Sequence, residues 1–174
     1  MTKQVAWKKA QAVAALTDIA GDISDFFGVP APVSYQPEYR TGQDWQIRID
    51  RLEVWTKAGR AELAVDVSRR FAHLYFRFDD PARAEKVFDM SRHDQRLNRH
   101  SGKWNRIGTP DSWARDGKPC PETSLDMFRA ELRRDFRRVA EPNPCPDDVA
   151  AYRAKEAARA AQFAAYLNET RAGV

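Results

Sequence analysis

The first part of the chain carries apolar residues at every third or fourth position, the spacing of a helix with one buried face. Over residues 3–27 this stripe consists of Val5, Ala12, Val13, Leu16, Ile19, Ala20, Ile23, Phe26 and Phe27. Gly28 follows directly, where a left-handed C-cap is usual, and Pro30 prevents the helix from continuing. The pattern predicts a long N-terminal helix over residues 3–27.

Residues 45–78 change to a period of two, which is typical of strands with one buried face. The apolar positions are Trp45, Ile47, Ile49, Leu52, Val54, Leu63, Val65, Val67, Leu74, Phe76 and Phe78. The alternation slips between Ile49 and Leu52, which indicates a bulge, and a turn is expected at 57–59. In the last strand His73, Tyr75 and Arg77 face the polar side. Three strands joined by short links predict an antiparallel meander.

The remaining elements follow from caps and prolines. Residues 30–37 hold three prolines and are expected to be irregular. The run Asp79-Asp80-Pro81 predicts a helix to about residue 90, and a short strand is expected at 103–107. Thr123-x-x-Asp126 resembles a capping box before a helical stripe. That stripe comprises Leu125, Phe128, Leu132, Phe136 and Val139.

The C-terminal part is rich in proline and then in alanine. Residues 141–147 form a proline-rich connector, and residues 148–171 form an alanine-rich helix with few large apolar residues. Residues 1–140 are expected to form a single domain. The order of elements predicts an α+β fold, an antiparallel three- to four-stranded meander with helices packed on one face and long N-terminal and C-terminal helices.

Composition and charge limit the class of protein and the cellular compartment that we expect. The 174 residues carry 29 Lys and Arg against 25 Asp and Glu, a net charge of +4. No apolar stretch approaches the ~20 residues of a membrane span, so no membrane partner is expected. The first residues do not fit a signal peptide, and two cysteines are too few for a disulfide framework. We therefore expect a cytoplasmic protein, in a host cell if the chain belongs to a phage.

The positive charge is concentrated in one segment. Residues 92–106 carry five basic side chains against one acidic residue, an excess equal to the net charge of the whole chain. With Trp104 they form the first set of candidate binding residues: Arg92, Arg96, Arg99, Lys103, Trp104 and Arg106. Trp104 could instead fill the core. A second basic stripe on the later helix comprises Arg129, Arg133 and Arg137, and nearby acidic residues make a purely solvated face the alternative reading.

No pattern indicates catalysis. His93, His100, Cys120 and Cys145 lack zinc-ligand spacing. Pro110-Asp111 and Asp116-Gly117-Lys118 contain the residue types of a metal-dependent nuclease motif. Only four residues separate the two aspartates, which is too short for the paired strands that would hold both carboxylates on one metal ion. A nucleophile elbow and a phosphate-binding loop are both missing. We expect a non-enzyme with no metal and no cofactor.

Two blocks carry a family resemblance, Arg77-Phe78-Asp79-Asp80-Pro81-Ala-Arg-Ala84 and Asn98-Arg-His-Ser-Gly-Lys-Trp-Asn105. Together they resemble small uncharacterised proteins of phages and other mobile elements, over residues 45 to 140. The resemblance transfers no catalytic residue. It implies a context in which small accessory proteins are often non-enzymatic binders, including inhibitors of host defence such as anti-CRISPR proteins.

The sequence hypothesis is therefore a non-catalytic binding protein of a phage or mobile element. Its partner would be nucleic acid or a host nucleoprotein or nuclease complex. Two alternatives remain, a metal-dependent hydrolase or nuclease and a structural or assembly protein of a virion. The oligomeric state is open between a monomer and a dimer formed through the terminal helices.

Overall fold

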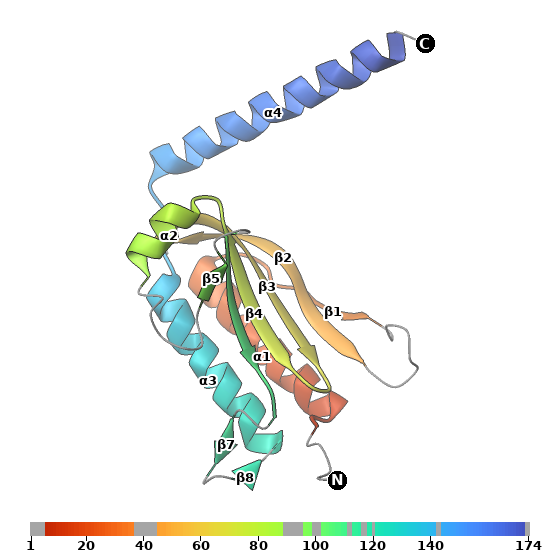
Figure 1. Cartoon of the computed structure of the whole chain (residues 1–174), viewed down its shortest axis with the longest axis vertical. Coiled ribbons are helices and arrows are strands. Elements are labelled where there is room, and N and C mark those ends of the chain that lie inside the picture. The colour runs from red at the N-terminus through yellow and green to blue at the C-terminus, as the bar shows by residue number, and fades with distance from the viewer. Residues whose placement is uncertain are drawn as a thin grey trace. The chain divides into compact units, whose positions relative to one another are not determined.

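A computed structural model describes residues 6–36, 45–88, 96–98, 102–110, 113–115, 118–119, 121–141 and 144–172 of the chain (Figure 1). Of residues 36, 96–98, 114–115, 119 and 171–172 it describes the backbone alone. The chain divides into two compact units, residues 1–142 and residues 143–174. No helix in the described ranges has the length and apolar character needed to cross a membrane.

The first unit is built on a six-stranded antiparallel sheet in the order β1-β2-β3-β4-β6-β5. Its strands are β1 (Val33–Gln36), β2 (Gln46–Thr56), β3 (Gly59–Ser68), β4 (Ala72–Phe78), β5 (Arg96–Asn98) and β6 (Lys103–Gly108). A separate two-stranded ribbon pairs β7 (Ala114–Arg115) with β8 (Lys118–Pro119). The α+β class and the meander β2–β3–β4 are confirmed, but the sheet is wider than the expected three to four strands.

Two strands of this sheet, β1 and β5, were not predicted, and β1 was missed because prolines flank it in the sequence. Pro32 stands immediately before Val33, and all four residues Val33–Gln36 pair with β2. Proline is tolerated at the end of an edge strand, where no ladder hydrogen bond is lost. The predicted bulge is confirmed between Ile49 and Leu52, where the register of β2 against β3 shifts.

The apolar side of the meander forms the core. All six apolar positions predicted for the second and third strands are buried, and Leu63, Phe76 and Trp104 lie opposite one another across β3, β4 and β6. Burial at such positions is worth several kcal/mol per large side chain, roughly 2–5 on truncation to alanine.

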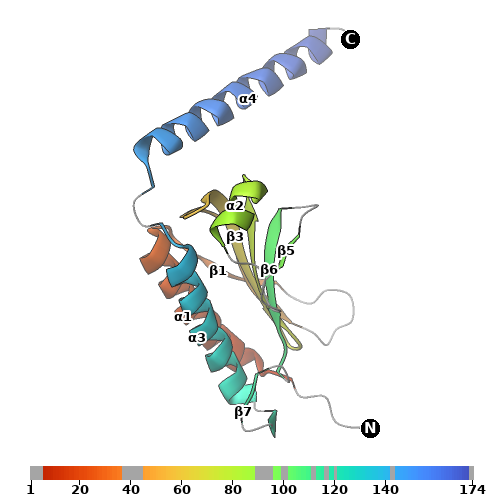
Figure 2. The same cartoon turned by 60° about the vertical axis from the view of Figure 1, so that its left-hand side comes forward.

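Helices α1 (Lys9–Phe27) and α3 (Pro121–Val139) lie together on this apolar face of the sheet (Figure 2). Helix α1 begins at Lys9, so the predicted start at residue 3 is wrong, because residues 6–8 are not helical. The helix ends as predicted, with Gly28 at φ 66° as a left-handed C-cap. Helix α3 begins at Pro121, so the capping box predicted at Thr123 is wrong. Proline is well suited to the first helical position, because its missing N–H has no partner there.

The short helix α2 (Pro81–Val87) closes one end of the same face. The Asp80 side chain accepts a hydrogen bond from the backbone N–H of Arg83 at 2.9 Å, which confirms the predicted acidic cap. Ala84 within the helix and Phe88 directly after it are both buried in the core.

The first residues described are also tied to the core. The indole Nε1–H of Trp7 donates a hydrogen bond to Ser124 Oγ at 2.6 Å. The Trp7 ring stacks on Trp113, which in turn packs against Phe128 of α3. Trp113 lies so close to Gly108 that any side chain at that position would overlap its ring. The chain before α1 is thereby fixed to α3 and to the end of β6.

The second unit contains the 27-residue helix α4 (Pro146–Ala172). It begins at Pro146, which lies within the connector predicted over residues 141–147. Proline again occupies a first helical position, where it costs nothing. Every residue from 153 to 170 is exposed.

Candidate binding surface

The candidate binding residues of the basic segment lie on and around β6. Arg92 and Arg99 fall outside the described residues, and for Arg96 only the backbone in β5 is described. Lys103, Trp104 and Arg106 belong to β6. Because successive side chains of a strand point to opposite faces, Lys103 lies on one face of the sheet and Trp104 and Arg106 on the other.

Trp104 belongs to the core. Its side chain is 2% exposed and stacks on Phe76, Phe78 and Phe88, with ring centroids 5.2 to 6.3 Å apart. Its indole Nε1–H has no hydrogen-bond partner among the described residues. In this fold Trp104 is therefore not available to stack on a base or to anchor a partner.

Arg106 is buried in an ion-pair cluster with α3. It is 5% exposed, and it pairs with Asp135 at 2.6 Å and with Glu131. Two carboxylates thus share one guanidinium. Burial raises the pKa of Asp135, and the attraction of Arg106 offsets that rise in part. The buried guanidinium of Arg106 is neutralised by these carboxylates, so it does not contribute to a basic surface.

The second predicted stripe joins the two long helices. Arg129 pairs with Asp18 of α1, and Arg133 pairs with Asp22 at 2.5 Å. This hydrogen bond raises the pKa of Arg133. Arg137, one turn further along α3, is exposed. Two of the three arginines therefore meet carboxylates of α1.

We expect Arg133→Ala to lower the free energy of unfolding by only about 0.2–1 kcal/mol, because the pair with Asp22 remains accessible to solvent. Urea denaturation of Arg133→Ala, Asp22→Ala and the double variant measures the coupling. A coupling energy above about 2 kcal/mol would contradict this assignment.

The sheet face opposite α1 and α3 carries a continuous polar and aromatic surface, here called the open face. No helix of residues 6–141, as far as these are described, covers it (Figure 2). Three cross-strand rows span its central strands. The rows are Arg48–Asp66–His73–Ile107, Ala64–Tyr75–Asn105 and Glu62–Arg77–Lys103.

The centre of the open face combines rings with hydrogen-bonding groups. His73 Nε2 lies 3.3 Å from Asn105 Oδ1, and the His73 and Tyr75 ring centroids are 5.4 Å apart. Ile107 lies opposite His73 and is 61% exposed. An exposed isoleucine next to two rings forms a small apolar area surrounded by polar groups, the composition of a protein interface.

The charges around this centre are largely paired. Arg48 Nε lies 3.2 Å from Asp66, and Arg77 donates to Glu62 at 2.7 Å. Lys103 forms no ion pair with any described residue. The three rows hold three cations and two carboxylates, so the face has no strong field of either sign.

Most of the residues considered for catalysis are not among the residues that the structure describes. His93, His100, Asp111, Asp116 and Cys120 do not belong to the described residues. Within the described ranges, no three His, Cys, Asp or Glu side chains are close enough together to hold a metal ion. The Cys145 thiol is free and exposed.

This chain matches no protein-family model, no curated protein and no solved structure with which it was compared. The open face therefore has to be interpreted from its own chemistry.

The open face was not among the binding surfaces predicted from the sequence. The signal was nevertheless present, because the alternation already placed His73, Tyr75 and Arg77 on the polar side of their strand. What the sequence could not show was which strand pairs with β4. The register places Asn105 and Ile107 of β6 beside His73 and Tyr75.

Proposed function

We propose that this protein is a non-catalytic binding protein that holds its partner on the open face of the sheet. The observation that carries the proposal is the centre formed on adjacent strands by exposed Ile107 with the half-buried His73, Tyr75 and Asn105. Rigid neighbouring strands hold these groups in fixed relative positions, which lowers the entropic cost of binding.

The charge arrangement favours a protein partner over free nucleic acid. Binding of nucleic acid requires cationic side chains that neutralise phosphates. On the open face Arg48 and Arg77 are paired with Asp66 and Glu62, so their charges are already largely neutralised. Those carboxylates also repel phosphate. A protein surface with matching polar groups and an apolar contact for Ile107 fits this face better.

The resemblance to small phage and mobile-element proteins supports a more specific version. In that context the partner is a nucleic-acid-handling complex of the host, and the protein acts in the host cytoplasm as an inhibitor of defence of the anti-CRISPR type. Direct binding of nucleic acid by the basic segment is the second candidate. Lys103 favours it, since this cation of β6 has no ion pair with any described residue and lies on the open face next to the edge strand β5.

The decisive variant is Ile107→Glu, which places a charge in the centre of the open face. We expect it to weaken partner binding by about 30-fold or more, the effect of losing a central contact worth about 2 kcal/mol. Tagged wild-type and variant proteins are incubated with extract of the host cell, and captured proteins are quantified by mass spectrometry. The dissociation constant is then measured with the purified partner.

Val87→Glu is the matched control, because Val87 is an exposed apolar residue of α2 and the charge change is identical. It should retain the partner. Equal retention by Ile107→Glu and Val87→Glu would contradict the assignment of the open face.

The second candidate is tested with labelled single-stranded and duplex DNA and RNA. If nucleic acid is the ligand, affinity falls steeply with salt, and the variant Arg96→Glu/Arg99→Glu/Lys103→Glu loses at least ~100-fold. We expect no such binding. Tight, salt-sensitive binding abolished by this triple variant would replace the protein partner with nucleic acid.

A further inference from the structure

Every residue of helix α4 from 153 to 170 is exposed, yet the helix carries large apolar side chains. Phe163 and Tyr166 are 63% and 60% exposed, and Leu167 is exposed beside them. A helix rich in alanine forms readily and needs no such side chains to be stable. Exposed large apolar groups spaced three and four residues apart indicate a contact face.

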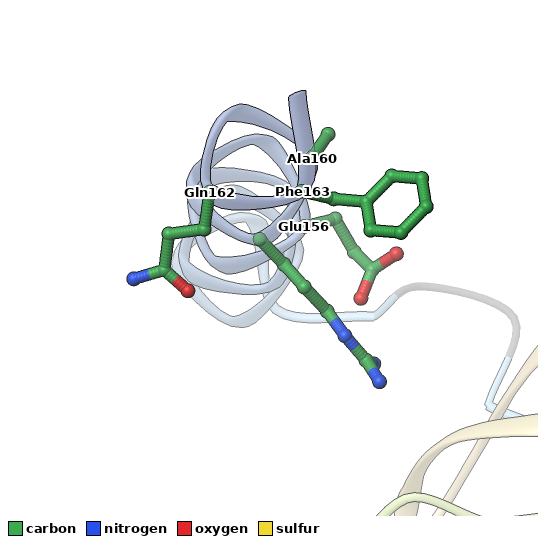
Figure 3. A pocket seen from close by; sticks show the side chains of 5 residues that line it. Glu156, Ala160, Gln162 and Phe163 are labelled. Atoms are coloured by element: carbon green, nitrogen blue, oxygen red, sulfur yellow. The ribbon is translucent and has the colours of Figure 1, made fainter. Parts of the chain in front are cut away.

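The apolar face follows a heptad pattern along the helix. Counted in steps of three and four, its positions are Val149, Tyr152, Glu156, Arg159, Phe163 and Tyr166. Val149 and Tyr152 are partly exposed, and the other four are exposed. Figure 3 shows Glu156 and Phe163 projecting from the same side of α4, with Gln162 on the other side. Two charged residues therefore lie in the middle of an otherwise apolar and aromatic face.

When two copies of this helix are paired antiparallel, the six positions of one copy face chemically matching positions of the other. In an antiparallel pair of helices, residues whose numbers add to a constant lie at the same height. With Glu156 level with Arg159 of a second copy, Tyr152 is level with Phe163 and Val149 with Tyr166. Each layer then contains either two apolar or aromatic groups or two opposite charges.

The reversed arrangement also excludes its main competitor. In a parallel, in-register pair Glu156 would face Glu156 and Arg159 would face Arg159. Like charges in adjoining positions destabilise a helix pair, whereas Glu–Arg contacts fix both its register and its direction. The alanine at position 160 flanks the central layers and allows the two helices to approach closely.

We propose that α4 is a self-association element that pairs antiparallel with α4 of a second copy of this chain, centred on reciprocal Glu156–Arg159 contacts. Such a contact is isologous, with the same patch used by both copies, and it closes at a dimer. The proposal is independent of the open face, which belongs to the other unit of the chain.

The first test is the mass of the full-length protein by light scattering after size exclusion, at about 100 µM because dimerisation depends on concentration. We expect twice the chain mass of 19.9 kDa. Glu156→Arg alone and Arg159→Glu alone should each raise the dimer dissociation constant at least ~100-fold, since each creates two like-charge contacts. Ala161→Arg is the control, because position 161 lies on the opposite side of the helix, and it should remain a dimer.

Charge exchange supplies the diagnostic result. The double variant Glu156→Arg/Arg159→Glu restores opposite charges in both central layers and should dimerise again. A mixture of the two single variants should form a heterodimer, although neither associates with itself. A wild-type protein that is monomeric at this concentration, or a mixture that stays monomeric, overturns the proposal.

The direction of pairing is tested by cross-linking. Both native cysteines are replaced with serine, and Tyr152→Cys and Phe163→Cys are introduced in separate chains. An antiparallel dimer gives a disulfide between positions 152 and 163 when the two proteins are mixed and oxidised. Preferential disulfides between identical positions would indicate a parallel pair and contradict the proposal.

Discussion

Replacing Arg106 with methionine is expected to lower the free energy of unfolding by about 3–5 kcal/mol at neutral pH. Methionine fills much of the same space, but it leaves the buried carboxylate of Asp135 without the guanidinium that compensates it at 2.6 Å. A buried carboxylate that loses its main ion-pair partner recovers less of its desolvation cost. Urea denaturation followed by tryptophan fluorescence measures the loss.

The loss should depend on pH with a defined sign. Burial raises the pKa of Asp135 and Arg106 lowers it, so in the methionine variant the folded-state pKa of Asp135 rises further. Because the pKa of Asp135 is higher in the folded state, its protonated form stabilises the fold. This contribution is fully present below the unfolded-state pKa, about 3.8, and is lost as the pH rises through the folded-state pKa. The difference between variant and wild type should therefore be smaller at pH 4–5 than at pH 7.

Arg134→Met is the matched control for this experiment. Arg134 lies on the same helix and pairs with Glu131 at 3.6 Å, but its side chain is exposed. Its substitution should change the free energy of unfolding by about 0.5 kcal/mol or less. A loss for Arg106→Met as small as that of the control, or one that does not vary with pH, would contradict a compensated buried carboxylate.

Replacing Trp104 with alanine is expected to cost about 3–5 kcal/mol, the range for removing a large aromatic side chain from a core. The cavity would open between Phe76, Phe78 and Phe88, which all stack on the indole. Trp104→Phe keeps a ring in this stack and removes an indole N–H that has no hydrogen-bond partner among the described residues, so its cost should be well under half as large. Thermal or urea unfolding distinguishes the two variants.

The same pair of variants separates stability from binding. If Trp104 acted as an exposed anchor, alanine would abolish partner binding and leave the free energy of unfolding unchanged. That combination would overturn its placement in the core.

The alternation rule predicted the sheet better than it predicted the surface. Apolar positions at every second residue identified the core side of β2, β3 and β4 correctly. The same rule applied to β6 separates Lys103 from Trp104 and Arg106. Treating residues 92–106 as one basic cluster ignored this separation, because charge was counted along the chain and not across the pleat.

Two partnerships of the basic residues had signals in the sequence. Asp18 and Asp22 are four residues apart on α1, and so are Arg129 and Arg133 on α3. Equal spacing of opposite charges on two amphipathic helices is what their pairing requires, and the structure brings these residues together.

The Arg106 cluster had a weaker signal. Asp135 lies on the apolar stripe of α3, next to Phe136, and a polar residue in a core position needs a partner. The sequence does not show that the partner is Arg106, because this depends on how α3 crosses the sheet.

The packing of α1 against α3 has a consequence for synthesis of the chain. The hairpins β2–β3 and β3–β4 join neighbouring segments and can form as soon as they leave the ribosome. Helix α3, and the hydrogen bond from Trp7 to a serine 117 residues away, must wait for almost the whole first unit to be translated. Until then the apolar face of the nascent sheet is only half covered. A chain stalled or truncated before Pro121 therefore presents this face to chaperones and to other nascent chains, which makes residues 121–139 the step that completes folding.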